Sequence, residues 1–100
     1  MKPIKFHRKA SEEYNEAILE YSSKSPKAGQ RFCEEIEKLI EEIARNPATF
    51  RRITGPYQRN FGSTFPHAVI YEEKPDCIHI VAIAHMHRRP NYWVDRIISE

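Results

Sequence analysis

The hydrophobic period of this sequence changes at Asn46-Pro47, and that change leaves few fold classes open. Before it, apolar residues recur every three or four positions, as they do along the buried face of a helix. After it, apolar and polar residues alternate or form short β-branched runs, as they do in strands. Helices grouped ahead of strands are typical of the α+β class with a largely antiparallel sheet. The predicted element order is β-α-α-β-β-β-α.

Two helices are predicted ahead of the change. The first covers about residues 11 to 23, with Ser11 as its N-cap. The second begins at Ser25-Pro26, where a capping residue precedes a proline in the first turn, and it ends at the change itself. Because only a few residues separate the helices, we expect an antiparallel helical hairpin. A short strand over residues 2–7 precedes the hairpin.

Three strands and a short closing helix are predicted after the change. The strands are expected at residues 57–61, 65–73 and 77–84, and the helix at residues 92–98. The last strand is a nearly continuous β-branched run, which is typical of a buried central strand. Since a helical hairpin covers only one face of a small sheet, we expect apolar surface to remain exposed on the other face.

Length and composition place the chain among ordinary globular domains. One hundred residues with 40% apolar and 30% charged side chains suit one domain over residues 1–100 and exclude a disordered or disulfide-rich chain. The longest apolar run, from Ile80 to Ala84, is too short to span a membrane, and no secretory signal pattern is present. We therefore expect a cytoplasmic protein. Cys33 and Cys77 are interpreted as small buried side chains.

Two segments of the second half carry bases but no carboxylate. The first lies between Arg45 and Tyr71 and contains Arg51, Arg52 and Arg59. The second runs from residue 77 to residue 94 and contains His79, His85, His87, Arg88 and Arg89. A guanidinium fork suits phosphate and carboxylate, and imidazole titrates near neutral pH. These segments are therefore interpreted as anion-binding or chemically active, with two solvated loops as the alternative.

Several segments together resemble a known family. They are the helical hairpin ending at Asn46-Pro47, the strand with Arg59, the stretch Phe65-Pro66-His67-Ala68-Val69-Ile70-Tyr71, and the ending from Ile80 to Pro90. Over essentially the whole chain they resemble the RelE/ParE superfamily of toxins from bacterial type II toxin–antitoxin modules. The resemblance implies a small toxin held inactive by a co-expressed antitoxin whose disordered segment wraps it. A homodimer or a toxin–antitoxin hetero-oligomer is the expected assembly.

The resemblance leaves two mechanisms open. RelE-like toxins cut messenger RNA on the ribosome, whereas ParE-like toxins inhibit DNA gyrase and are not nucleases, and the fold alone does not choose between them. The Phe-Pro-x-x-(Ile/Val)-x-Tyr strand and the His-x-x-Arg-x-Pro ending favour the ParE-like, plasmid-stabilisation side. We therefore expect inhibition directed at gyrase or a similar protein. The alternatives are a ribosome-dependent messenger RNA endonuclease and a non-toxic small RNA-binding module.

Eight residues are candidates for the site. If the protein is a nuclease, the candidate catalytic residues are Arg59, His85, His87 and Arg88. The candidates for binding nucleic acid or another target are Arg51, Arg52, Arg89 and Tyr92. The resemblance implies that Arg59 lies in the site, where it would clamp a phosphate. The alternative is a structural arginine paired with a distant acid such as Asp95 or Glu72.

The histidines of the second segment raise the question of a metal. His85 and His87 are two positions apart, so on a strand both would face one side of the sheet. That spacing fits a pair of metal ligands, but no Cys or carboxylate is close in sequence to complete a tetrahedral set. We expect neither a metal nor another cofactor, so an enzyme of this sequence would be a metal-independent endoribonuclease. His67 and His79 are interpreted as packed histidines.

Overall fold

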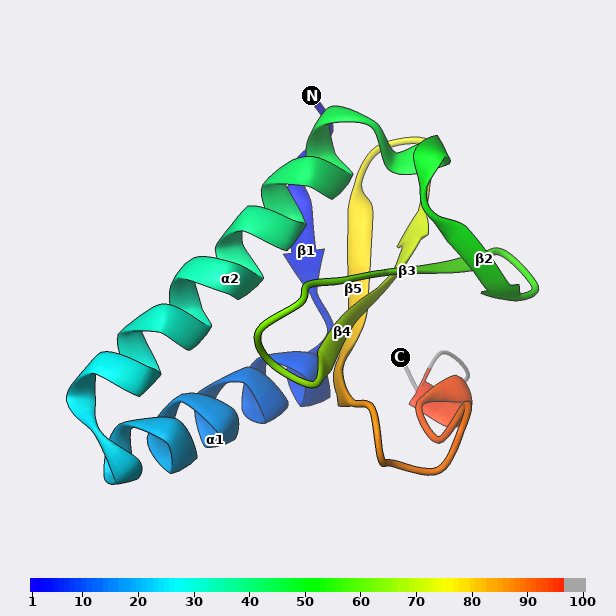
Figure 1. Ribbon diagram of the computed structural model, residues 1–100. Coiled ribbons are helices and arrows are strands. Elements are labelled where there is room, and N and C mark those ends of the chain that lie inside the picture. Colours follow the sequence, from blue (N-terminus) through cyan, green and yellow to red (C-terminus); the bar gives the residue numbers. More distant parts are fainter. Residues whose placement is uncertain (97–100) are drawn as a thin grey trace.

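A computed structural model describes residues 1–96 of the chain. Its elements are β1 (Ile4–Phe6), α1 (Arg8–Lys24), α2 (Pro26–Arg45), β2 (Arg51–Thr54), β3 (Tyr57–Phe61), β4 (His67–Glu73) and β5 (Ile78–His85), with short 3-10 turns at Pro47–Thr49 and Val94–Arg96. The α1–α2 hairpin lies on one side of the sheet, and the segment after β5 turns back below the strands (Figure 1). The α+β class is confirmed.

The sheet has five strands in the order β1-β5-β4-β3-β2. Neighbouring strands run antiparallel except β1, which lies parallel to β5. This arrangement confirms a mainly antiparallel sheet, with the continuous apolar run of β5 placed inside it. No helix among the described residues is both long and apolar enough to cross a membrane.

The helical hairpin forms as the sequence predicts, with one correction at its start. Ser25 caps α2 by accepting a hydrogen bond from the Ala28 backbone N–H at 3.0 Å. The first helix begins before Ser11, because His7 is its N-cap and its Nδ1 accepts from the Lys9 N–H. The His7 N–H itself bonds to the Ile80 carbonyl of β5, so the chain passes from strand to helix without a loop.

Strand β2 is missing from the sequence prediction, which therefore has one strand too few. Its sequence, Arg-Arg-Ile-Thr, has no apolar alternation, and it forms by hydrogen bonding to β3 across the turn at Gly55. Gly55 has φ of 50°, a left-handed conformation that suits glycine. The predicted closing helix is reduced to a 3-10 turn at Val94–Arg96, and its last two positions lie outside the described residues.

Apolar residues pack on both faces of the sheet. Between the sheet and the helices lie Phe32, Ile36, Ile43, Val69, Tyr71 and Ile80, among others. On the opposite face lie Tyr57, Ala68, Ile70, Val81, Ala82, Ala84 and Trp93. The expectation of exposed apolar surface on this face is wrong for these residues, which are buried, with the Trp93 ring 5.1 Å from the Tyr57 ring. Of the large apolar side chains on this side, Phe61 and Met86 stay exposed. Cys77 is buried as expected, while Cys33 is half-buried.

Candidate functional site

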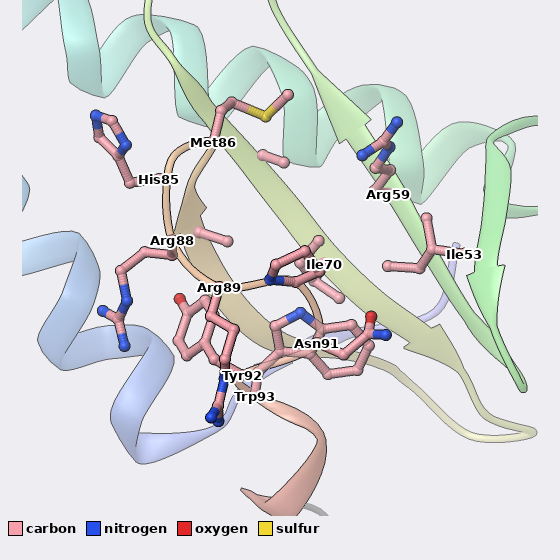
Figure 2. Close-up of a pocket in the computed structure, with 13 residues that line it drawn as sticks. Ile53, Arg59, Ile70, His85, Met86, Arg88, Arg89, Asn91, Tyr92 and Trp93 are labelled. Atoms are coloured by element: carbon pink, nitrogen blue, oxygen red, sulfur yellow. The ribbon is translucent and has the colours of Figure 1, made fainter.

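A cleft of about 160 Å³ opens on the sheet face away from the helices. It is lined by Ile53, Arg59, Ala68, Ile70, Ala84, His85, Met86, Arg88, Arg89, Pro90, Asn91, Tyr92 and Trp93. Figure 2 shows Arg59 and Ile53 on one side of the cleft and the loop residues Arg88, Arg89 and Tyr92 on the other. Because pockets for cofactors and drug-sized ligands hold about 300 to 1,000 Å³, this cleft suits a side chain or a small anion.

Arg59 is the cation that the fold places most firmly in the cleft. On β3 it lies between two cross-strand neighbours, Arg51 of β2 and Ile70 of β4. Its guanidinium stacks on the Phe61 ring at 5.3 Å. Its Nε is buried and has no hydrogen-bond partner within the part of the chain that the structure describes. The alternative pairing with Glu72 or Asp95 is therefore not found, and Arg59 stays available for an anion.

The other candidate arginines separate by the face on which they lie. Arg51 shares the cleft face with Arg59 because the two are paired across β2 and β3. Arg89 lines the cleft from the loop after β5. Arg52 follows Arg51 on β2, so strand alternation turns it to the helix side, where it pairs with Gln58. The structure therefore places Arg59, Arg88 and Arg89 around the cleft and Arg51 beside Arg59 on the same sheet face, while Arg52 lies on the helix side.

His85 and His87 lie close together, although not for the reason that their spacing suggests. Strand β5 ends at His85, and His87 lies in the following turn, so the predicted common strand face is wrong. The turn nevertheless brings the two rings to 5.0 Å. The His87 backbone N–H donates to Nδ1 of His85 at 3.1 Å, which assigns the proton of neutral His85 to Nε2.

Tyr92 and Arg88 are held by a carboxylate that the sequence prediction missed. The Tyr92 hydroxyl donates to Oε2 of Glu13 at 2.6 Å, and the guanidinium of Arg96 donates to both Glu13 oxygens. Burial and then this hydrogen bond raise the pKa of Tyr92. The Arg88 guanidinium lies 3.8 Å from the centre of the Tyr92 ring. Through Tyr92, Glu13 therefore fixes the wall of the cleft that carries Arg88.

Glu13 could have been found from its position along the first helix. It stands three residues after Ala10 and four before Ala17, and both alanines are buried. A carboxylate on the buried stripe of a helix needs a partner, which makes it a candidate for an ion pair. Its partner, Arg96, is 83 residues away in sequence, and no local pattern identifies it.

A second hollow lies on the other side of the loop after β5. Its lining consists of Glu13, Glu16, Ala17, Glu20, His67, Ile83, His85, Arg88 and Tyr92. The His67 ring lies edge to face with His85 at 5.0 Å, and its Nδ1 is 3.5 Å from the Tyr21 hydroxyl. His67 is 7% exposed, which confirms that it is a packed histidine. No group of three or more His, Cys, Asp or Glu suited to a metal occurs among residues 1–96.

These features define the class to which the protein belongs. A two-helix hairpin packed on a small, mainly antiparallel sheet is the architecture expected from the RelE/ParE resemblance. The chain belongs to the family described as the ParE toxin of the type II toxin–antitoxin system parDE, whose sequence model matches residues 4–90.

A solved structure has the same fold. It is a chain of the chromosomal ParDE toxin–antitoxin system from P. aeruginosa, with a TM-score of 0.74 and 16% sequence identity, and the match covers 87% of this chain and 98% of that one. No curated protein matches the sequence significantly. The family match and this likeness confirm the resemblance identified from the sequence.

Replacing Glu13 with glutamine tests the link between α1 and the wall of the cleft. Glu13→Gln should lower the free energy of unfolding by about 3 kcal/mol or more, because it leaves the buried Arg96 guanidinium without its counter-ion. Denaturant titration measures the change. Glu16→Gln, an exposed change on the same helix, is the control and should stay within about 0.5 kcal/mol of the parent. Equal stability of the two variants would contradict the link.

Burial of His67 makes stability depend on pH. Burial, and then the neighbouring His85, lower the pKa of His67 from 6.5 to about 4, despite opposing effects of Glu20, Glu13 and Glu35. Between these two pH values the unfolded chain binds the proton more readily than the folded one. The contribution of His67 to the free energy of unfolding should therefore be fully present above pH 6.5. It should fall as the pH drops toward 4, by at most about 1.4 kcal/mol per pH unit.

Denaturant titrations across this pH interval measure the effect. His67→Gln should have a smaller pH slope than the parent, whereas the control His87→Gln, at an exposed position, should keep the parent slope. A slope that is the same in His67→Gln and in the parent would mean that other groups account for it.

Proposed function

We propose that this protein is the toxin of a type II toxin–antitoxin module and acts in the cytoplasm. It inhibits growth by binding DNA gyrase or a similar protein unless a cognate antitoxin neutralises it. The match of the ParE toxin family to residues 4–90 carries this proposal. The cleft supports it, because Arg59, Arg51 and Arg89 offer guanidinium groups to an acidic surface of the target.

The hydrogen bonds in the cleft favour target binding over RNA cleavage. Metal-free cleavage needs a base for the 2′-hydroxyl, an acid for the leaving oxygen and a cation for the phosphate. Nδ1 of His85 already accepts from the His87 N–H, and the Tyr92 hydroxyl already donates to Glu13. Both groups are therefore already used in hydrogen bonds within the protein and are not free to accept the proton of the 2′-hydroxyl. No lysine lines the cleft, so a lysine-based nuclease site has no support here.

A messenger RNA endonuclease is the second candidate function. One observation favours it, since the imidazoles of His85 and His87 lie 5.0 Å apart in the turn that also carries Arg88. In that case the imidazolium form of His85 or His87 would act as the acid, and Arg59 would hold the phosphate.

Induction of the protein in a bacterial host separates these functions. We expect growth to stop with filamentous cells, purified protein to inhibit supercoiling by gyrase, and co-expressed antitoxin to restore growth. A halt of translation with cleaved messenger on ribosomes and unaffected gyrase would instead support the endonuclease. Normal growth with folded protein accumulating would support the non-toxic RNA-binding module.

Substitution of Arg59 tests the cleft as the target-binding site. Arg59→Ala should change the free energy of unfolding by no more than about 1 kcal/mol, because no carboxylate is paired with this side chain among residues 1–96. Inhibition should fall about tenfold or more, the expected effect of losing a charge-assisted hydrogen bond. Arg45→Ala, which removes an exposed arginine at the end of α2, is the matched control. A large loss of melting temperature with inhibition intact would make Arg59 a structural residue.

A further inference from the structure

The second hollow, on the α1 side of the loop after β5, is lined by three acids. Glu13, Glu16 and Glu20 lie on one face of α1, three or four positions apart, with Ala17 between them. Both oxygens of Glu13 already accept hydrogen bonds from the segment after β5. Neither Glu16 nor Glu20 forms an ion pair within residues 1–96. Two carboxylates without a counter-ion in that range therefore line this acidic hollow of about 170 Å³.

A buried histidine opens on the acidic hollow. His67 is 7% exposed, and its Nδ1 lies 3.5 Å from the Tyr21 hydroxyl. Its Nε2 has no hydrogen-bond partner among the described residues. Solvent nevertheless reaches this atom, because the one fully enclosed side-chain nitrogen or oxygen without a partner in residues 1–96 is Nε of Arg59. Since His67 lines the acidic hollow, its Nε2 is reached from there.

The His67 ring supplies a hydrogen-bond acceptor beside the carboxylates. Burial and then His85 lower its pKa to about 4, although nearby glutamates, Glu20 first, oppose them, so the imidazole is neutral at pH 7. A neutral imidazole has one donor and one acceptor nitrogen, and a hydroxyl can pair with either. When Nδ1 donates to the Tyr21 hydroxyl, Nε2 is left as the acceptor.

The rest of the lining sets the size and the charge of a ligand. Ala17 and Ile83 are apolar, and the volume is below the roughly 300 Å³ at which cofactor sites begin. The Arg88 guanidinium stacks on the Tyr92 ring and forms no ion pair with the helix within residues 1–96. No set of three side chains suited to a metal occurs in that range either. A primary ammonium group fits, because it has three N–H donors for three acceptors and an alkyl stem for the apolar surface.

We propose that the acidic hollow binds a primary alkylammonium group, whose three N–H bonds donate to Glu16, Glu20 and Nε2 of His67. The lysine side chain of another protein and a free aliphatic amine, such as a polyamine, both carry this group. The site is distinct from the cationic cleft, although the loop after β5 forms a wall of both. The inference goes beyond the proposed function and does not depend on it.

Nuclear magnetic resonance titration of the isotope-labelled full-length protein tests this site at neutral pH. The probe is n-butylamine, because it carries the ammonium group and the stem of a lysine side chain. We expect saturable shifts of the Ala17 and Ile83 amides and of the His67 imidazole, whose Nε2 resonance reports the new hydrogen bond. Butyltrimethylammonium has the same charge without N–H donors and should leave the Nε2 resonance unchanged.

Substitutions locate the ammonium group. Glu16→Gln and Glu20→Gln should each weaken butylamine binding about threefold and together about tenfold, as expected for partly solvated ion pairs. Both variants should stay folded, because these side chains are exposed. Arg88→Gln should strengthen binding about twofold by removing a like charge from the lining. Glu34→Gln, which removes an exposed carboxylate of α2, is the matched control and should bind as the parent does.

Two further probes distinguish the sources of the ammonium group. Spermidine represents a free polyamine, and a capped glycine-lysine-glycine peptide represents a protein side chain. Each is titrated into the protein already saturated with butylamine. The probe that displaces butylamine at the lower concentration identifies the source, and displacement by either one supports the site.

Several outcomes would overturn the inference. The absence of saturable shifts at Ala17 and Ile83 would exclude the site. Equal effects of butylamine and butyltrimethylammonium on the His67 imidazole would show that charge alone attracts amines. Equal losses in Glu20→Gln and Glu34→Gln would place the binding on the acidic helix surface in general. Tighter binding of Zn²⁺ than of butylamine, with the same imidazole shifts, would assign the acidic hollow to a metal.

Discussion

The Glu13 carboxylate joins α1, the outer edge of β5 and the segment that carries Tyr92 and Arg96. Strand β5 continues past the three positions paired with β1, so among residues 1–96 no strand lies beside the rest of its outer edge. Glu13 of α1 accepts from the Ile83 N–H on this edge, and Arg96 donates to the Val81 carbonyl. The register shift between Ile70 and Tyr71 leaves Val81 as the extra residue of β5. One buried ion pair therefore closes the sheet edge and fixes the segment that forms the cleft wall.

The cleft stays cationic because the nearby carboxylates of α2 accept hydrogen bonds on the helix side of the sheet. Glu35 of α2 accepts from the backbone N–H groups of Thr64 and Phe65, which holds the β3–β4 loop against the helix. Glu42 of α2 accepts from the Asn60 amide. Since these acids lie on the helix side, no carboxylate among residues 1–96 pairs with Arg59 on the cleft side. This separation of charge leaves a cationic surface with the chemistry to bind an acidic group.

The local pattern of the sequence determined the helical hairpin and the α+β class. Periodicity and capping depend on residues a few positions apart, which is why Ser25-Pro26 marks the start of α2 reliably. The acid-free segments likewise drew attention to Arg59, because a base with no nearby acid is visible in the sequence itself. The family resemblance rested on the same local segments, and the match over residues 4–90 agrees with it.

Only the tertiary structure decided which side chains meet. Strand β2 exists because β3 lies beside it, and Trp93 covers the second sheet face because the chain turns back after β5. The pairing of Glu13 with Arg96 spans 83 positions, a separation at which sequence patterns carry no information about contact. The sequence by itself therefore supplied the arginines and the helices. The packing of distant segments decided that the Arg59 Nε would have no hydrogen-bond partner among residues 1–96, because only the complete sheet places it between Arg51 and Ile70.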